Sequence, residues 1–239
     1  MVLIHQYYAV RKFLKFCYFI SVLFFFSCGN GAKNENNKED IIATESEEVS
    51  TSTTDTDKII LCFGDSITAG FGLDDTNNAY PALLQSKIDS LGLDYTVINS
   101  GLSGETSAGG RSRVNWVLNQ EVDIFLLELG ANDGLRGVPL SETRANLQAI
   151  IDMVRERNPS TKIILAGMQL PPNMGEAYTT EFKDIFSELA EKNNTDYIPF
   201  ILEDVGGIAE LNQGDGIHPN IEGHKIVAEN VWTILKPML

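Results

Sequence analysis

The sequence predicts a doubly wound α/β sandwich, and three observations lead to this fold class. Beyond residue 57, short apolar runs alternate along the chain with segments of helical periodicity. Most runs are apolar at nearly every position, as expected for parallel strands that are covered on both faces. Hydrophobic residues make up 43% of the 239 residues, enough for a sizeable core. The expected strands are residues 58–63, 95–99, 122–129, 162–168 and, with a weaker pattern, 196–200.

Helices are expected between and after these strands. Apolar residues recur there at the i, i+3, i+4, i+7 spacing of one helix face. We expect Ser141 to cap the first of these helices and Pro159 to end it. The residues that carry the spacing are Leu147, Ile150, Ile151 and Val154, then Phe182, Ile185, Phe186 and Leu189, and finally Ile226, Val227, Val231, Trp232 and Leu235.

The N-terminus has the features of an export signal. Three basic residues precede an apolar run, residues 16–28, that is too short to span a bilayer comfortably. The run ends at Cys28, which is flanked by small residues. This arrangement resembles a bacterial lipoprotein signal, in which residues 1–27 are removed and Cys28 carries the lipid. An uncleaved membrane anchor and an ordinary signal peptide are the alternatives.

The next segment, residues 28–57, is predicted to be a flexible tether. It is poor in aromatic residues and rich in Asn, Glu, Ser and Thr, so it cannot bury enough apolar surface to offset its ordering entropy. The folded domain is therefore expected to comprise residues 58–239. Its lone Cys62 cannot form an internal disulfide there, and within an apolar strand it is most simply an inert core residue.

Net charge narrows the range of partners. The formal charge of the chain is −15, and removal of the basic N-terminal stretch would make the remainder more acidic. An acidic surface repels phosphate backbones, so nucleic acid is excluded as an expected partner. The glycine-containing turns lack the Gly-Lys-Ser/Thr of a phosphate loop, and no cofactor is expected.

Polar residues follow the first three strands. Ser66 in FGDSITAG lies at a strand-to-helix turn, where backbone N–H groups and the helix dipole surround its oxygen, although a plain N-cap has the same pattern. Gly104 in GLSGETS allows a close backbone approach to a ligand or merely a positive φ. Asn132 in ELGANDGLRG can project its amide over the sheet edge, or belong to an ordinary turn that Asp133 pins. Glu128, a carboxylate within an apolar run, is expected in a satisfied polar network.

An acid and a base lie three positions apart near the C-terminus. In GDGIHPN, the Asp215 carboxylate can reach the imidazole of His218 within one turn. Such a pair can be the base of a hydrolase with its orienting acid, or a capped turn. His224 is expected on the surface or in helix packing. A zinc site that combines it with Asp215, His218 and Glu222 lacks a recognised ligand spacing, so no metal is expected.

Taken in order, FGDSITAG, GLSGETS, LGANDG and DGIHPN resemble the four signature blocks of the SGNH (GDSL-type) hydrolase superfamily. Over residues 58–239 the chain is most similar to its bacterial periplasmic arylesterase, thioesterase and lysophospholipase group. The resemblance implies a three-layer, flavodoxin-like fold with a five-stranded parallel sheet. It implies Ser66 as nucleophile, His218 as general base and Asp215 as orienting acid. The implied oxyanion hole consists of the N–H groups of Ser66 and Gly104 and the amide of Asn132.

The resemblance also points to the acyl pocket, next to the loop after the fourth strand. Leu135, Leu170, Met174 and Tyr178 are the apolar candidates, although they could merely close the core under long loops. The leading interpretation is a monomeric, exported serine esterase in the cell envelope that acts on small-molecule or lipid acyl esters or thioesters. An O-acetyl esterase that acts on envelope or dietary glycans is the alternative. A non-enzymatic envelope-binding lipoprotein is the hypothesis from another class.

Overall fold

The computed structural model describes residues 58–239. The predicted signal peptide, Cys28 and the tether lie outside these residues. Five strands form one parallel sheet in the order β2-β1-β3-β4-β5. The strands are β1 (Lys58–Gly64), β2 (Tyr95–Gly101), β3 (Ile124–Glu128), β4 (Lys162–Ala166) and β5 (Asp196–Ile198). The α-helices are α2 (Ser66–Ala69), α3 (Tyr80–Ser90), α4 (Ser107–Val117), α5 (Ala131–Arg136), α6 (Leu140–Arg157), α7 (Glu176–Asn193) and α8 (Ile221–Leu235), and the short 3₁₀ turns are η1 (Thr76–Asn78), η2 (Pro172–Met174), η3 (Ala209–Leu211) and η4 (Lys236–Met238).

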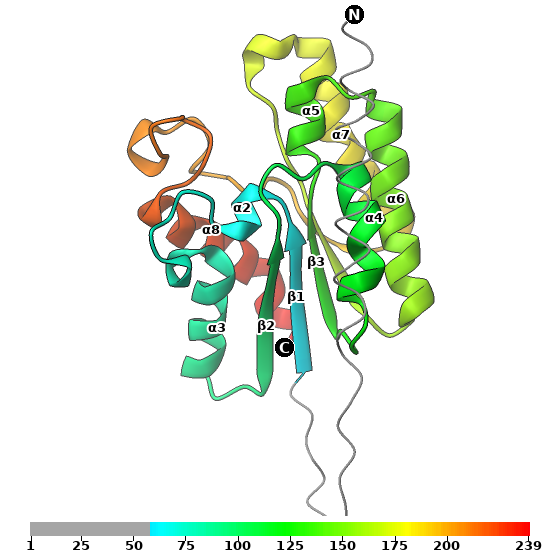
Figure 1. Ribbon diagram of the computed structural model, residues 1–239, viewed down its shortest axis with the longest axis vertical. Coiled ribbons are helices and arrows are strands. Elements are labelled where there is room, and N and C mark those ends of the chain that lie inside the picture. Colours follow the sequence, from blue (N-terminus) through cyan, green and yellow to red (C-terminus); the bar gives the residue numbers. More distant parts are fainter. Residues whose placement is uncertain (1–57) are drawn as a thin grey trace, which may run out of the picture. The chain divides into compact units, whose positions relative to one another are not determined.

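Helices cover both faces of the sheet. Helices α4, α6 and α7 pack in sequence on one face, whereas α3 and α8 pack together on the other (Figure 1). The strand order reverses direction next to β1, so the chain winds outward first one way and then the other. The predicted fold class, a three-layer α/β/α sandwich with a five-stranded parallel sheet, is confirmed.

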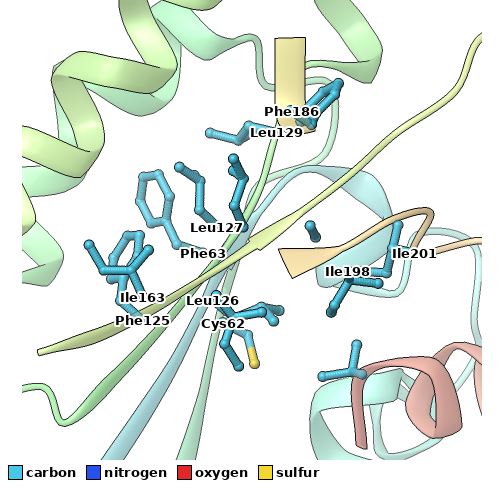
Figure 2. Packing of buried hydrophobic residues seen from close by; sticks show 14 of the residues in the cluster. Cys62, Phe63, Phe125, Leu126, Leu127, Leu129, Ile163, Phe186, Ile198 and Ile201 are labelled. Atoms are coloured by element: carbon cyan, nitrogen blue, oxygen red, sulfur yellow. The ribbon is translucent and has the colours of Figure 1, made fainter. Parts of the chain in front are cut away.

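The core lies on both sides of the central strands. Side chains alternate along a strand, so Phe63 and Phe125 point to one face while Cys62 and Leu126 point to the other (Figure 2). The rings of Phe63 and Phe125 lie 5.4 Å apart between their centroids. All four side chains are buried, which explains why the sequence of these strands is apolar at successive positions.

Strand register brings three loops to one edge of the sheet. Gly64, the last residue of β1, is paired with Gly101 of β2 on one side and with Glu128 of β3 on the other. The strands are parallel, so the segments that follow them leave from the same edge. This is the edge at which open α/β sheets bind ligands.

The ends of α6 and of all five strands differ from the predictions, most clearly in α6, β3 and β5. Helix α6 begins at Leu140 after Pro139, so Ser141 lies inside the helix rather than at its cap, whereas the end at Arg157 agrees with the stop expected from Pro159. Strand β3 starts at Ile124 and ends at Glu128, and β5 is only three residues long. Apolar residues that flank these strands are buried in the loops, where they pack without joining the hydrogen-bonded ladder.

His224 joins α8 to α3. Its side chain is buried, and its Nδ1 accepts a hydrogen bond from the backbone N–H of Tyr80 at 3.3 Å. Tyr80 is the first residue of α3, and the preceding Ala79 has no side chain that could cap the helix. His224 therefore satisfies an N–H group at a helix start, in agreement with the helix-packing alternative. Burial, and secondarily the charge of His218, lower the pKa of His224 to about 4.

None of the helices within residues 58–239 is long and apolar enough to cross a membrane.

Replacement of His224 by Gln should reduce the acid sensitivity of the fold. The pKa of His224 is about 4 in the folded protein and about 6.5 in an unfolded chain, so the unfolded state binds an extra proton between these values. Relative to His224→Gln, the wild type should lose up to about 3 kcal/mol of unfolding free energy as the pH falls from 6.5 to 4.

Urea unfolding of both proteins at several pH values measures this difference. The shifted pKa values of Asp65 and Glu128 affect both proteins alike, so the difference between them isolates His224. Curves of unfolding free energy against pH that run parallel over this interval would refute the predicted neutral His224.

Candidate active site

Ser66 lies at the start of α2, immediately after β1. Asp65 caps this short helix, and its carboxylate accepts the backbone N–H of Ile67 at 3.0 Å. Ser66 is therefore the first residue of the helix. It is not the N-cap, which was the structural alternative considered for it from the sequence. The turn is tight because Gly64 has no side chain: a Cβ there would lie 2.1 Å from Thr68 Oγ1 and 2.4 Å from Glu128 Oε2.

His218 connects Ser66 and Asp215 in one hydrogen-bonded line. Its Nε2 lies 2.9 Å from Ser66 Oγ, and its Nδ1 lies 2.6 Å from Asp215 Oδ2. A carboxylate can only accept, so Nδ1 carries the hydrogen and Nε2 is free to accept the serine hydroxyl. The other carboxylate oxygen of Asp215 accepts the backbone N–H groups of Ile217 and His218 at 3.0 and 3.1 Å. The acid and the imidazole thus share one compact turn.

The environment of Asp215 keeps it ionised. Partial burial alone would raise the pKa of this carboxyl, but the hydrogen bond with His218 and those from the two backbone N–H groups outweigh burial and lower the pKa to about 2. Asp215 therefore carries a negative charge throughout the neutral range. That charge holds the imidazole in the tautomer described above.

Two residues that the sequence did not single out hold the His218 loop against the Ser66 loop. The ring of Phe71 packs on the imidazole of His218 with 4.7 Å between ring centroids. The side-chain amide of Gln213 donates to the carbonyls of Phe71 and Pro219 at 2.6 and 3.0 Å. Its backbone N–H donates to the backbone carbonyl of His218 at 2.8 Å. These contacts join segments about 140 residues apart, which no local sequence pattern reveals.

Asn132 and Gly104 lie at the same edge. One N–H of the Asn132 amide is bonded to Asp65 Oδ2 at 3.1 Å, which leaves its second N–H without an assigned partner. Gly104 has a φ of +79°, a conformation that favours glycine. Within residues 58–239, neither the N–H of Gly104 nor that of Ser66 donates to another residue. Three N–H donors that follow β1, β2 and β3 at this edge of the sheet are thus without a partner among the described residues.

Arg136 connects two of these groups. Its guanidinium donates to the carbonyl of Gly104 at 3.0 Å and to the side-chain oxygen of Asn132 at 3.3 Å. The bond to Asn132 occupies the oxygen of the amide, which orients the NH₂ group toward Asp65. No role was assigned to Arg136 from the sequence, because a polar residue at a helix end usually serves only as a solvated charge.

Buried ionic groups hold the loops from behind. Asp133 accepts the backbone N–H of Ser107 at 2.7 Å and its hydroxyl at 2.5 Å, so it pins the start of α4 to the Asn132 loop as expected. Glu105 pairs with Arg113, which also donates to the carbonyl of Ser100 at 2.8 Å. The loops therefore have little freedom to shift relative to each other.

Asp65 and Glu128 are two buried carboxyl groups next to the turn that carries Ser66. Burial raises the pKa of Asp65 to about 6, although its hydrogen bonds from Ile67 and Asn132 act in the opposite direction. Burial, and then the charge of Asp65, raise the pKa of Glu128 well above its ordinary value. Glu128 also departs from the fully satisfied network expected from the sequence, because its Oε1 has no hydrogen-bond partner within residues 58–239.

A cavity of about 410 Å³ opens beside Ser66 and His218. Of the four residues proposed for the acyl pocket, Leu135 and Leu170 line this cavity, whereas Met174 and Tyr178 do not. Instead Met174 packs at the margin of the core, and Tyr178 donates its hydroxyl to the carbonyl of Gly134 at 3.2 Å. The lining also contains large apolar residues that the sequence did not reveal: Ile67, Met168, Phe200, Leu202 and Ile217.

Residues 58–239 contain no group of three or more His, Cys, Asp or Glu side chains placed to hold a metal ion. The arrangement instead has a serine hydroxyl bonded to an imidazole, a carboxylate behind the imidazole, and unpaired N–H donors in the loops at the same edge of the sheet. This combination can activate a serine for attack on a carbonyl group and hold the oxygen that becomes negative.

Comparison with known proteins agrees with this chemistry. Residues 62–226 match the model of the GDSL-like Lipase/Acylhydrolase family. Esterase TesA of Pseudomonas aeruginosa is 41% identical over 181 residues, which cover 75% of this chain and 89% of that protein. Thioesterase 1/protease 1/lysophospholipase L1 of Escherichia coli K12 is 34% identical over 181 residues, which cover 75% and 84%.

Solved structures similar to this one also include an esterase. The crystal structure of the psychrotrophic esterase EstA from Pseudoalteromonas sp., inhibited by monoethylphosphonate, aligns with a TM-score of 0.71 at 33% identity and covers 76% of this chain and 98% of that one. The family model spans well over half of the chain, including each of the loops described above. This chain therefore belongs to the GDSL-like lipase/acylhydrolase family.

Proposed function

We propose that this protein hydrolyses carboxylic esters and thioesters through an acyl-enzyme intermediate on Ser66. The observation that carries the proposal is the unbroken line from Asp215 through His218 to Ser66, which ends beside an apolar cavity. Membership of a family of lipases and acylhydrolases, with relatives named esterase and thioesterase, supports the same chemistry.

In the proposed first step, Ser66 Oγ attacks the carbonyl carbon of the substrate. His218 Nε2 takes the hydroxyl proton, and the negative charge of Asp215 stabilises the imidazolium that results. The carbonyl oxygen becomes an oxyanion, which the N–H groups of Ser66, Gly104 and Asn132 receive. The intermediate then collapses: the bond to the leaving group breaks, and His218 returns its proton to the departing oxygen or sulfur.

In the second step, water replaces the leaving group. His218 takes a proton from the water, whose oxygen attacks the acyl carbon, and the same three donors hold the second oxyanion. Collapse breaks the bond to Ser66 Oγ, which regains its proton from His218. A carboxylic acid is released, and the protein returns to its starting state without a net change.

The cavity supports a substrate with an apolar acyl group. Leucine, isoleucine and phenylalanine side chains form much of its lining, and its volume lies in the range of sites that hold small organic molecules. The Escherichia coli relative is named both a thioesterase and a lysophospholipase. We therefore propose esters and thioesters of medium or long acyl chains, including lysophospholipids, as the substrate class.

The two alternatives are less favoured. An O-acetyl esterase of glycans needs room for an acetyl group and a polar surface for the sugar, whereas this cavity is larger than an acetyl group and mainly apolar. A binding lipoprotein without activity has no need for the hydrogen-bonded line of Ser66, His218 and Asp215.

For the N-terminal region we propose export, removal of residues 1–27 and lipidation of Cys28. The basic residues, the apolar run and the small residues around Cys28 support this proposal. A lipid chain on Cys28 and a polar tether would hold the esterase at a membrane while the domain itself remains in water.

The acyl-chain range can be measured with p-nitrophenyl acetate, octanoate and palmitate. We expect turnover to peak on octanoate or palmitate, because only longer chains fill the apolar cavity. Ser66→Ala should abolish the activity on every ester, whereas the control Ser187→Ala, a change at an exposed serine of α7, should leave it intact. Turnover on acetate alone would favour the glycan deacetylase, and no serine-dependent turnover would favour the binding lipoprotein.

Asn132→Ala should lower kcat by about 10²–10³ with little change in KM, because one of the oxyanion donors is lost. Steady-state kinetics together with thermal unfolding separate this effect from loss of the fold. A variant with wild-type kcat would remove Asn132 from the proposed oxyanion hole.

Cys28→Ala should move the full-length protein from the membrane fraction to the soluble fraction after expression in a bacterium with a lipoprotein pathway. The control Cys17→Ala, within the part of the chain predicted to be removed, should stay with the membranes. Membrane retention of Cys28→Ala would indicate an uncleaved anchor, and a soluble wild type would indicate an ordinary signal peptide.

A further inference from the structure

Glu128 is the one polar side chain of strand β3, and its carboxyl group lies under the turn that carries Ser66. The residue is fully buried. Its Oε2 accepts the backbone N–H of Asp65 at 3.2 Å and the hydroxyl of Thr68 at 2.7 Å. Both donors flank Ser66 in the chain, so one carboxyl oxygen holds the turn on both sides of the serine.

The surroundings of Glu128 do not favour a negative charge. Within residues 58–239 no cation pairs with it, and Oε1 has no partner. The titratable groups that face it are Asp65, Cys62 and Tyr80, all of which are acids. An unpaired buried carboxylate is costly, and such a group keeps its proton instead.

We propose that Glu128 is a positioning residue that works as a neutral carboxylic acid and fixes the nucleophile turn against the oxyanion hole. This inference rests on the esterase function proposed above. Glu128 fixes the position of the Asp65 backbone because it accepts the Asp65 N–H. The Asp65 carboxylate in turn accepts an N–H of the Asn132 amide at 3.1 Å. The serine and the oxyanion-binding amide therefore take their positions from the same carboxyl group.

Neutrality of Glu128 has a consequence for the reaction. The transition state places a negative charge on the substrate oxygen near Ser66, and a buried negative charge on Glu128, in addition to that of Asp65, would oppose it. A neutral Glu128 also allows Asp65 to stay ionised, since two adjacent buried carboxyl groups do not both lose their protons readily. Ionised Asp65 keeps its bond to Asn132 and favours the positive His218.

If Glu128 served only the stability of the fold, activity would fall on mutation only as far as stability does. Replacement of the neutral carboxyl by leucine removes the unpartnered Oε1 but leaves the buried N–H of Asp65 without its acceptor, while the Thr68 hydroxyl keeps its bond to Tyr80 at 2.9 Å. The gain and the loss oppose each other, so the stability of Glu128→Leu should stay close to that of the wild type. Under the proposal, activity thus falls without a comparable loss of stability.

The test uses Glu128→Leu, Glu128→Gln and the control Leu126→Met, a volume-conserving change in the same strand. Each protein is assayed for Ser66-dependent hydrolysis of p-nitrophenyl octanoate and for its melting temperature. Glu128→Leu should lower kcat by about 10–100-fold with KM within about two-fold, because a small displacement of the nucleophile is enough to slow the reaction. Its melting temperature should stay close to that of the wild type.

Glu128→Gln should keep kcat within about five-fold of the wild type from pH 6 to 9, since its amide oxygen can still accept both bonds and carries no charge. Leu126→Met should leave kcat unchanged. In a double-mutant cycle, Thr68→Val should add little to the loss in Glu128→Leu, because both remove the same contact.

Three results would overturn the proposal: wild-type kcat in Glu128→Leu, a loss in Glu128→Gln as large as in Glu128→Leu, or a fall in kcat that accompanies a lower melting temperature and a higher KM. If Glu128→Leu does not fold, Glu128→Gln still decides between a neutral acid and a charge. Failure of the proposed function itself would appear separately, as wild-type hydrolysis that does not depend on Ser66.

Discussion

The close approach of three backbone segments at Gly64 is the constraint on which the site depends. Gly64 ends β1, and any side chain there would collide with Thr68 and Glu128. Because Gly64 is paired with Gly101 and Glu128 on the neighbouring strands, the same point also sets where the other loops leave the sheet. The loops of Ser66, Gly104 and Asn132 can therefore leave the sheet side by side only if β1, β2 and β3 pack closely at Gly64.

Charge is distributed unequally across the junction. Asp215 lies toward the solvent, where hydrogen bonds from His218 and the backbone lower its pKa to about 2. Asp65 and Glu128 lie beneath the serine, where burial raises the pKa of both. The environment thus separates carboxyl groups of similar chemistry into an ionised partner for the imidazole and a buried pair under the turn.

The acyl cavity illustrates how far sequence patterns extend. Leu135 and Leu170 were recognised because they lie in or next to the signature loops, and both line the cavity. Phe200 and Leu202 come from the segment after the short strand β5, which has no motif of its own. Met174 and Tyr178 lie in the same stretch of sequence but not in the lining, because proximity in sequence to a lining residue does not determine which way a side chain points in a loop.

The sequence by itself predicted the five strands, the fold class and, from apolar periodicity, the helices α6, α7 and α8 of the described domain. The loops that carry Ser66, Asn132 and the Asp215–His218 pair were identified through the resemblance of their motifs to a known family. Both kinds of signal lie within single short stretches of chain. Only the tertiary structure decided that Asp65 rather than Ser66 caps α2, that Arg136 and Gln213 bridge separate loops, and that Glu128 retains an unpaired oxygen. The Asp65 cap is a local contact with Ile67, but two residue types at the same turn could have made it, and only the folded backbone shows which one does. The other two features depend on contacts between residues far apart in the chain, and such contacts exist only once the sheet has brought its loops to one edge.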